Sequence, residues 1–441
     1  MGEMFSCVKG MKDWYGAEAL ERERIVAILR DTFKAYGFSP LETPQIEYVD
    51  VLTKKGGQEI QKEIYYGFDQ AGRKFGLRFD LTVPLARFVA TKKTLKLPYK
   101  RYSIGEVFRD GASQPEQGRY RCITQCDVDI IGVKEMCAEA ELIMLACDVF
   151  NKIGLSNVEI RLNNRKLLNG LMVGFGVKND LLTSVLVALD KFDKIGFDGV
   201  IKELNGINGL QEEEIKNIRN IMKLGGTNEE ILKELEKLAK NDLAKEGVQE
   251  LREILSYLDS DNVVKIAPYL ARGLDYYTGP VMEGFSTKGE IKSSILGGGR
   301  YDNMIGDFIG TNEKIYAVGF SFGLERITSL LKKDKGEENI SPAQIFIVPL
   351  ASLKESFRIA KNLRDAGINV DVDLKKRNLK KSLSYAEALG IPYVGILGDD
   401  EIKKGLISVK DLKRRVQKEM SLEELKKKLK EEKTEGHEKS S

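Results

Sequence analysis

The sequence predicts an α+β protein: an antiparallel-sheet domain with a helical insertion, followed by a smaller α/β domain. Three observations support this. Residues 100–132 contain two alternating strand patterns joined by a loop with glycines and a proline, which is typical of a long-looped antiparallel hairpin. Residues 178–262 carry repeated amphipathic helix patterns. Residues 344–412 alternate strand and helix patterns, as chains with a mainly parallel sheet do.

The return strand of the hairpin, which we expect to start near Arg119, carries a row of polar side chains. Because side chains alternate along a strand, one face holds Arg119, Arg121, Gln125, Asp127 and Asp129. A single polar residue there would ordinarily face water. The row, however, mixes cations and anions, and Arg109 extends it across the loop. Since guanidinium groups pair well with phosphate oxygens, we predict a site for a ligand with anionic and cationic ends.

Length and composition set the class of protein. A chain of 441 residues with 31% charged and 42% hydrophobic residues is expected to form several domains. No apolar run reaches the length of a membrane span, and the N-terminus lacks a secretory signal pattern, so we expect a cytoplasmic protein. The odd cysteine count favours reduced structural thiols. These are Cys7, Cys122, Cys126, Cys137 and Cys147.

The single histidine, His437, restricts the chemistry. It lies in a charged C-terminal stretch. General-base histidine, Ser-His-Asp or Cys-His catalysis and histidine-ligated metal are therefore excluded within one chain, and we predict no protein metal site. The net charge is only +3, so nucleic-acid contacts would have to come from local patches. Any catalysis must rely on positioning and charge.

The N-terminal half contains three further elements. Residues 17–36 have helical spacing and stop before Gly37. Residues 38–48 are predicted to form a strand interrupted by prolines, which favours an edge or interface position. Residues 75–90 are predicted to form a strand with Asp80 and Thr82 on one face. An acid and a hydroxyl there would suit an ammonium group.

The β pattern resumes after the insertion. Arg272 precedes a turn, and Tyr276 and Tyr277 are predicted to start a strand, one facing the core and one a ligand. The glycine-rich residues 296–302 are expected to let a flat ligand approach the backbone. Residues 319–327 are predicted to be a strand that runs into a helix carrying Arg326.

These patterns divide the chain into six predicted segments: a sheet domain in two parts at 1–177 and 263–330, a helical insertion at 178–262, a linker at 331–343, an α/β domain at 344–418 and a charged tail at 419–441.

Four stretches resemble one known family. FRDGASQPEQGRYRCITQCDVDIIG at 108–132 is similar to motif 2 of the class II aminoacyl-tRNA synthetases, in their histidyl branch. ARGLDYYTG at 271–279 and GGGRYD at 297–302 resemble the histidine-specific motifs, and GFSFGLERI at 319–327 resembles motif 3. The family order is kept, and the C-terminal domain resembles the anticodon-binding domain. Residues 17–48 resemble motif 1, which implies a homodimer.

The resemblance implies histidine–tRNA ligation through a histidyl-adenylate, with ATP as substrate, Mg²⁺ held mainly by the phosphates, and tRNA(His) as partner. Catalysis is expected from Arg109 and Arg272. ATP binding is expected from Arg109, Arg119 and Arg326. The histidine-binding residues expected from the family are Asp80, Leu81, Thr82, Arg109, Gln125, Asp129, Arg272, Tyr276 and Tyr277. The insertion is expected near the tRNA acceptor stem.

The chain departs from the family pattern in motif 2, because Gly111 stands where an acid is usual and Asp110 directly follows Arg109. The group that meets adenine therefore stays open. Two alternatives also stay open: a catalytically inert paralogue such as the regulatory subunit of ATP phosphoribosyltransferase, which normally lacks a C-terminal anticodon domain, and a tRNA-binding regulatory module without turnover.

Overall fold

The computed structural model describes residues 6–54, 58–92, 94–259, 263–272, 276–288, 291, 293–311, 313–332, 340–375 and 377–438. The chain forms two compact units. The first comprises Met1–Lys12, Val26–Asn151 and Leu155–Leu331, and the second Asp13–Ile25, Lys152–Gly154 and Lys332–Ser441. Much of the predicted linker, residues 333–339, lies outside the described residues, as does the side chain of His437.

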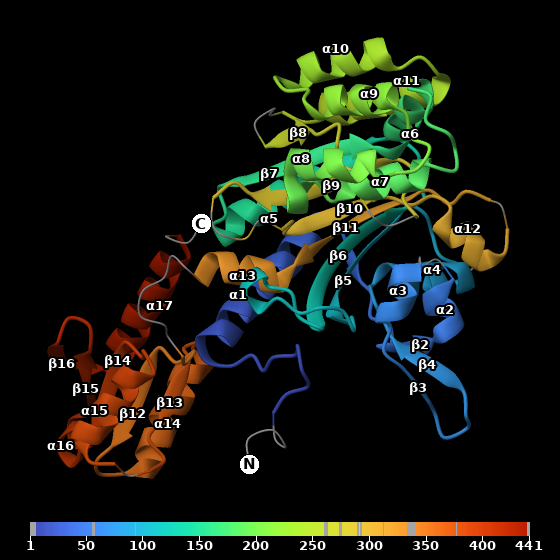
Figure 1. Cartoon of the computed structure of the whole chain (residues 1–441). Coiled ribbons are helices and arrows are strands. Elements are labelled where there is room, and N and C mark those ends of the chain that lie inside the picture. Colours follow the sequence, from blue (N-terminus) through green and yellow to red (C-terminus); the bar gives the residue numbers. More distant parts are fainter. Residues whose placement is uncertain are drawn as a thin grey trace. The chain divides into compact units, whose positions relative to one another are not determined.

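A large sheet forms the centre of the first unit, in the order β1-β5-β6-β11-β10-β9-β7-β8 (Figure 1). Its strands are β1 (Ser39–Pro40), β5 (Tyr99–Phe108), β6 (Cys122–Ile131), β7 (Val158–Asn164), β8 (Val264–Ile266), β9 (Pro280–Ser286), β10 (Leu296–Arg300) and β11 (Ala317–Gly323). Strands from β5 to β7 pair antiparallel, while β1 and β8 pair parallel at the edges. The predicted antiparallel sheet is confirmed.

The hairpin is formed by β5 and β6, paired from Tyr99 opposite Ile131 to Phe108 opposite Cys122. The return strand thus starts three residues later than Arg119, a correction to the prediction. The loop closes itself instead: Pro115 opens a short 3-10 turn, η1 (Pro115–Gln117), and Gly118 ends it with a φ of 65°. That left-handed backbone favours glycine, and it turns the chain before the ladder can begin.

The predicted strand at 75–90 is wrong beyond its first residues. β4 (Lys74–Leu77) ends early, and residues from Thr82 form α4 (Thr82–Thr91). Asp80 explains the switch, because its Oδ1 accepts hydrogen bonds from the backbone N–H groups of Thr82 (3.1 Å) and Val83 (2.9 Å). A carboxylate at this place satisfies N–H groups that a new helix leaves free. Asp80 therefore starts a helix.

β4 belongs to a separate three-stranded sheet, β2-β4-β3, with β2 (Ile46–Tyr48) and β3 (Tyr66–Phe68). The proline-bearing stretch 38–48 is thereby divided, because β1 lies at the edge of the large sheet and β2 at the edge of the small one. The predicted edge position is confirmed, but one continuous strand is not formed. Two short helices follow these strands, α2 (Val49–Thr53) and α3 (Gln58–Glu63).

Helices cover one face of the large sheet. They include α1 (Gly16–Ala35), which stops before Gly37 as predicted, and α5 (Cys137–Ile153). Phe33 of α1 lies 5.5 Å from Tyr102 and 6.2 Å from Phe322 between ring centroids, and Phe150 of α5 lies 5.5 Å from Phe322. These contacts fix which face is the core face. The other face carries the polar row of β6. α12 (Met304–Ile309) and α13 (Leu324–Lys332) complete this part.

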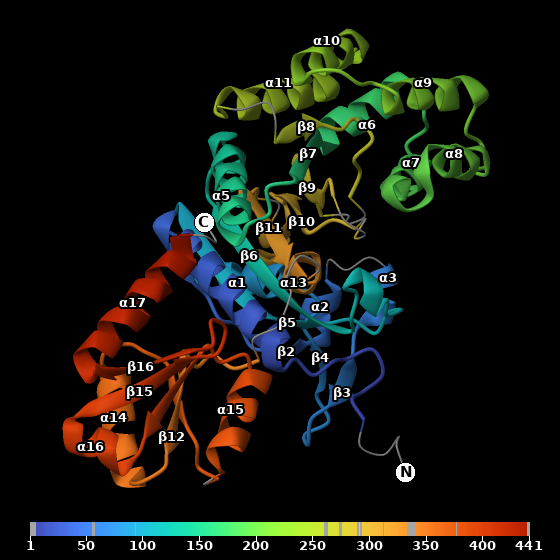
Figure 2. The same ribbon diagram turned by 90° about the vertical axis from the view of Figure 1, so that its left-hand side faces the viewer.

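The insertion is helical, as predicted, and its helices gather beyond the β7–β8 edge of the sheet (Figures 1 and 2). They are α7 (Leu182–Asp190), α8 (Phe192–Asn205), α9 (Glu212–Met222), α10 (Asn228–Leu238) and α11 (Asp242–Ser256), and α6 (Arg165–Gly174) directly precedes the insertion. The predicted capping box is confirmed, with Thr227 N donating to Glu230 at 2.8 Å. Two glycines let α6 and α11 touch, because a Cβ at Gly170 or Gly247 would meet the backbone of the facing helix.

The second unit has a five-stranded sheet in the order β13-β12-β14-β15-β16. Its elements are β12 (Ile345–Pro349), α14 (Leu353–Asp365), β13 (Val370–Val372), α15 (Leu379–Ala388), β14 (Tyr393–Leu397), α16 (Asp399–Lys404), β15 (Leu406–Asp411), β16 (Val416–Ser421) and α17 (Leu422–Glu438). β13, β12 and β14 are parallel, as the alternation predicts, while β15 and β16 pair antiparallel.

The expectation of a charged tail from residue 419 is corrected. Leu425 and Leu429 of α17 are 0% and 1% exposed and belong to the core around β12. Tyr393 also donates a hydrogen bond to Glu432 of this helix at 2.5 Å. The leucines lie four residues apart, so they form an apolar stripe among many lysines and glutamates. Of the helices the structure describes, none has the length and apolar character to cross a bilayer.

Candidate active site

The polar row of β6 lies on the face of the large sheet that α1 and α5 leave uncovered. Gln125, Asp127 and Asp129 share this face, as alternation predicts. Cross-strand pairing adds their neighbours: Gly105, Ser103 and Arg101 on β5, and Gly323, Ser321 and Gly319 on β11. Asp127 and Asp129 are 3% exposed. The row is therefore a buried polar surface in the middle of a sheet.

Glycines on the neighbouring strands make room for side chains of this surface. A Cβ at Gly319 would collide with the carboxylate of Asp129, and one at Gly297 would collide with the guanidinium of Arg272. A Cβ at Gly299 would lie 2.8 Å from the ring of Tyr277. We expected the glycines of residues 296–302 to let a flat ligand approach the backbone. At Gly297 and Gly299 the side chains of Arg272 and Tyr277 fill that space instead.

Acidic groups gather at one end of the surface. The Oδ2 atom of Asp129 lies 2.7 Å from Nη2 of Arg101, and its Oδ1 accepts a hydrogen bond from Tyr301 Oη at 2.5 Å. Asp127 lies 3.8 Å from the same Arg101 nitrogen. Burial raises the pKa of Asp127 to about 7, although Arg101 opposes this shift. Burial also raises the pKa of Asp129.

The turn at the start of α4 adds a third acid. Asp80 is buried, and burial raises its pKa against the opposing backbone amides and Arg109. Leu81, the next residue, accepts a hydrogen bond through its carbonyl from Arg101 Nη2 at 3.2 Å. Thr82 is half-buried as the first residue of α4. The carboxylate of Asp80 lies close enough to Asp127 and Asp129 to raise both of their pKa values, so the acids converge.

Arginines gather at the other end. Arg109 donates from Nε to the Phe79 carbonyl at 3.2 Å, and Arg326 donates from Nη1 to the Ser294 carbonyl. Burial lowers the pKa of Arg326, and repulsion from Arg109, Arg119 and Arg272 lowers it further. Such crowding of like charges favours the binding of a polyanion. Arg119 itself is exposed in the hairpin loop.

Arg272 is held from two sides. Its Nη1 lies 3.2 Å from Oε1 of Glu283, and its guanidinium lies 5.5 Å from the ring centroid of Tyr277. Burial opposes the charged form, yet Tyr277 and Glu283 raise the pKa of Arg272 overall. The residues that follow it in the quoted motif, 273–275, lie outside the described residues.

The prediction that Tyr276 and Tyr277 face opposite sides of a strand is wrong. Both precede β9, and their rings lie 4.8 Å apart. Tyr276 also lies 6.2 Å from Tyr301, edge to face, and Tyr301 binds Asp129. The tyrosines can sit together because residues before a strand do not follow its alternation.

Arg121 is not part of the ligand-facing row. It pairs with Asp110 at 3.1 Å and donates to the Gly111 carbonyl at 3.1 Å, so it holds the hairpin loop together. The carboxylate of Glu63 lies 2.6 Å from where a Cβ at Gly111 would be. An acid thus approaches the position where motif 2 normally carries one, but from α3.

Arg101, Tyr301, Ser321 and Glu283 were missed from the sequence. Tyr301 stands within the quoted GGGRYD stretch, and the alternation of β5 could have placed Arg101 on one face. Neither pattern shows that both residues meet Asp129, because that contact depends on the pairing of strands distant in the chain.

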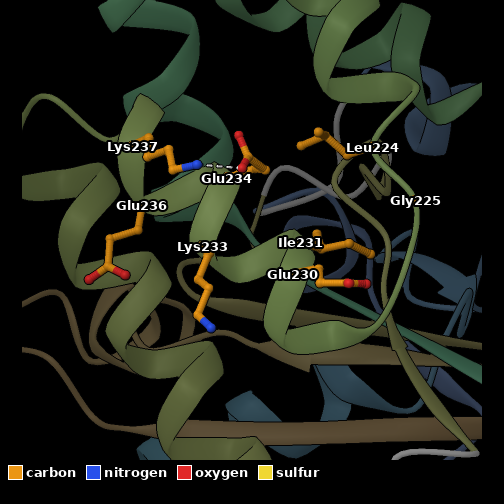
Figure 3. A pocket seen from close by; sticks show the side chains of 8 residues that line it. All are labelled: Leu224, Gly225, Glu230, Ile231, Lys233, Glu234, Glu236 and Lys237. Atoms are coloured by element: carbon orange, nitrogen blue, oxygen red, sulfur yellow. Dashed lines mark hydrogen bonds and ion pairs between the residues drawn. The ribbon is translucent and has the colours of Figure 1, made fainter.

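A cavity of about 610 Å³ lies in the insertion (Figure 3). It is lined by Leu224, Gly225, Glu230, Ile231, Lys233, Glu234, Glu236 and Lys237. Glu230 caps α10, and Lys237 pairs with Glu234 at 2.6 Å. Its charged groups serve local structure, so we assign no site there.

An antiparallel sheet with acids at one end and arginines at the other, on a chain with a separate α/β unit, has the architecture of a class II aminoacyl-tRNA synthetase. The family model described as histidyl-tRNA synthetase matches residues 10–327, and the anticodon binding domain matches residues 344–432. The chain belongs to the histidyl-tRNA synthetase family.

Individual relatives agree with this. The chain is 41% identical over 428 residues to histidine–tRNA ligase 1 of Bacillus cereus, covering 95% of this chain and 96% of the relative. It is 39% identical to histidine–tRNA ligase of Clostridium tetani, covering 95% of this chain and 96% of the relative. A histidyl-tRNA synthetase from Nostoc aligns with a TM-score of 0.85 at 31% identity, covering 97% of this chain and 99% of that one.

One further structure shares the fold alone. It is an ATP phosphoribosyltransferase regulatory subunit/histidyl-tRNA synthetase from Bacillus halodurans, with a TM-score of 0.72 and 23% identity, covering 87% of this chain and 97% of that one.

Proposed function

We propose that the polar surface of the large sheet binds histidine and ATP side by side, forms histidyl-adenylate and pyrophosphate, and transfers the histidyl group to the 3′ end of tRNA(His). The family membership supplies the reaction, that of an ATP-dependent histidine–tRNA ligase. One observation carries the assignment to this surface: acids converge at one end and arginines at the other. A cationic amino acid and a polyphosphate fit that polarity.

The amino-acid end would use the residues expected from the family. Asp80, Leu81, Thr82 and Gln125 would surround the α-ammonium group. Gln125 supports this, because its Nε2 donates to Ser321 at 3.2 Å while its buried Oε1 accepts no hydrogen bond from any described residue. Asp129, with Tyr276 or Tyr277, would bracket the imidazole nitrogens, since an unpaired nitrogen in a buried pocket is costly.

In the first step the histidine carboxylate would attack the α-phosphate in line. A carboxylate O–P bond forms as the bond to pyrophosphate breaks, and no proton moves. Arg109 and Arg272 would stabilise the charge on the α-phosphate, because preorganised cations need no proton transfer. Arg119 and Arg326 would hold the terminal phosphates and adenine.

Mg²⁺ would enter with the nucleotide and be held mainly by its phosphates, where it neutralises charge. Glu283 fits a supporting role, since it is a half-buried carboxylate in the field of Arg272 and Arg326. If one oxygen of Glu283 binds Mg²⁺, the remaining ligand positions of the ion are taken by phosphate oxygens and water.

In the second step a terminal hydroxyl of tRNA(His) would attack the histidyl carbonyl: an ester bond forms as the acyl–phosphate bond breaks, and AMP leaves with the hydroxyl proton passing to its phosphate. The anticodon-binding domain, which we propose to span 344–418 together with α17, would bind the other end of the tRNA. The insertion at 178–262 would lie near the acceptor stem. The remaining boundaries are proposed at 1–177 and 263–330 for the sheet domain and 331–343 for the linker. We place the protein in the cytoplasm, where translation occurs.

A homodimer is proposed through the small sheet and the motif 1 region. Glu47 and Gly76 occupy one face of the small sheet and are buried. On the opposite face, Ile46 and Tyr48 are 52% and 58% exposed, and they pair with Leu77 and Phe75. An apolar strip of this kind at a sheet edge marks an association surface.

The first experiment is ATP–pyrophosphate exchange with each of the twenty amino acids. We expect exchange with histidine alone. Arg272→Ala should reduce the rate by about 10²–10³-fold, the usual cost of one transition-state contact, with an unchanged far-UV spectrum. Arg161→Ala is the matched control, because Arg161 also pairs with a glutamate and lies over an aromatic ring. Absence of exchange from folded protein would favour the regulatory paralogue instead.

A further inference from the structure

Arg101 is a fully buried arginine of β5 that none of the proposed binding or catalytic roles includes. Its side chain is 0% exposed. From one nitrogen, Nη2, it reaches the carboxylate of Asp129 at 2.7 Å and the carbonyl of Leu81 at 3.2 Å. Asp129 and Leu81 belong to opposite ends of the proposed histidine site. One side chain thus ties the two ends together.

The electrostatic setting shows what Arg101 must balance. Asp127 lies 3.8 Å from it on the same face as Asp129, and the carboxylate of Asp80 acts on both. Without a fixed cation, these acids would repel one another and reorient. Arg101 is the buried cation that contacts two of them.

The cluster is incomplete by itself. Among the described residues, Nε and Nη1 of Arg101, Oδ1 of Asp127 and Oδ2 of Asp129 have no hydrogen-bond partner, so Asp129 Oδ2 meets Arg101 as an ion pair. Purely structural arginines in this chain are satisfied differently. Arg300, 1% exposed, makes two hydrogen bonds to Glu139 at 2.6 and 2.8 Å and a third to the Val133 carbonyl at 3.1 Å. Buried polar groups are rarely left unpaired, so the Arg101 cluster is built to be completed by a ligand or by water.

We propose that Arg101 is a positioning residue for histidine: it fixes the carboxylate of Asp129 and the Asp80–Thr82 turn at one separation, so that the imidazole and the ammonium group are recognised together. It acts through these groups. A lysine would not replace it, because an ammonium is strongly hydrated, loses its proton more readily when buried and sits on a flexible stem, whereas the guanidinium stays charged and rigid.

The inference rests on the proposed function of this surface, so histidine binding is measured separately from catalysis. Calorimetry gives the Kd of histidine and of ATP, and pyrophosphate exchange gives KM and kcat. Arg101→Lys should weaken histidine binding at least tenfold and raise the KM for histidine in parallel. The Kd of ATP should change less than twofold. If the wild-type protein binds histidine but shows no pyrophosphate exchange, the ligase assignment is overturned. The effect of Arg101→Lys on the Kd of histidine can still be compared with wild type in that case.

A double-mutant cycle with Asp129→Asn tests the route of action. Because Arg101 acts partly through Asp129 and partly through the Leu81 carbonyl, the double variant should bind histidine more weakly than Asp129→Asn alone but clearly more tightly than the product of the two single effects predicts. If the effects of the two single substitutions on the Kd of histidine multiply fully, the proposal is overturned. It is also overturned if the Arg101→Lys protein folds and binds histidine as the wild type does. Arg101→Gln provides a second variant if the lysine form does not fold.

Arg300→Lys is the matched control. It removes an equally buried arginine from the same sheet, and the β10–β11–β6 pairing places it on the face opposite Asp129. It should lower the melting temperature without changing the Kd of histidine. If it weakens histidine binding as much as Arg101→Lys does, the effect is general destabilisation and the proposal fails.

Discussion

Gly319 lies directly opposite Asp129 in the β6–β11 ladder, and the carboxylate of Asp129 occupies the space where a side chain at position 319 would begin. The guanidinium of Arg272 likewise occupies the space where a side chain at position 297 would begin. The absence of a side chain at Gly319 and Gly297 is therefore what lets two proposed site residues lie against the sheet.

We expect Gly319→Ala to displace Asp129. The added methyl group also meets the Val128 carbonyl at 2.7 Å, so it cannot be accommodated by a side-chain shift alone. Overpacking of this kind costs about 1–3 kcal/mol, and the KM for histidine should rise at least tenfold. Histidine-dependent pyrophosphate exchange and thermal melting measure both effects.

Gly323→Ala is the control on the same strand and face. Its new methyl group would meet Arg326 only at 3.7 Å, an ordinary contact. Its KM for histidine should stay within twofold of wild type. Equal effects of the two substitutions would show that an added methyl group at either glycine disturbs the site, whatever its distance from Asp129.

A polyanion should stabilise the arginine end of the site. Because Arg109, Arg119 and Arg272 crowd Arg326, pyrophosphate binding relieves their repulsion. At a hundred times its Kd, pyrophosphate should stabilise the fold by about 2.7 kcal/mol, which thermal melting can follow. Arg326→Gln should require at least tenfold more pyrophosphate for the same shift, while the shift caused by histidine stays the same. An equal shift from sodium chloride at matched ionic strength would contradict a specific site.

Asp127 should make stability depend on pH. Burial raises its pKa from 3.8 to about 7, so the folded state binds this proton more tightly than the unfolded state. The stabilisation from protonated Asp127 is therefore complete below pH 4 and is lost as pH rises toward 7, by at most about 1.4 kcal/mol per pH unit. Asp127→Asn has no carboxyl group to ionise at this position, so it does not lose this stability as the pH rises. Its melting temperature relative to wild type should be higher at pH 7 than at pH 5.

Asp373→Asn is the contrast for this measurement. Although burial acts in the opposite direction, hydrogen bonds from Ser382 and Lys375 lower the pKa of Asp373 overall, so its contribution is constant between pH 5 and pH 7. Its melting temperature relative to wild type should be the same at both values. A similarly constant difference for Asp127→Asn would refute the raised pKa.

A charge on the open face of the small sheet should weaken self-association. Ile46→Glu places a carboxylate in the apolar strip beside Leu77, and burying it in an interface would be costly. Sedimentation velocity should show a monomer at concentrations where wild type is a dimer. Phe68→Glu, an exposed position paired with Lys74 on the other face, should remain dimeric. If neither variant dissociates, this face is not the interface.

Local patterns predicted much of the fold. The helix at 17–36, the capping box at Thr227 and the strand–helix alternation of the second unit were all recognisable, because each depends on residues a few positions apart. The errors had two different causes. The strand predicted at 75–90 gives way to a helix from Thr82 because the Asp80 carboxylate accepts hydrogen bonds from the first helical N–H groups, a local signal that was overlooked. The leucines of α17 stand among charged residues, and only their packing around β12 shows that they belong to the core.

The sequence by itself determined that Gln125, Asp127 and Asp129 share one face, because alternation is a property of the strand alone. It also carried the motifs that identify the family. Only the tertiary structure decided that Arg101 and Tyr301, the second of them 172 residues from Asp129, bind that carboxylate. The reason is physical: the register between strands depends on pairing across the whole sheet, which no short stretch of chain encodes.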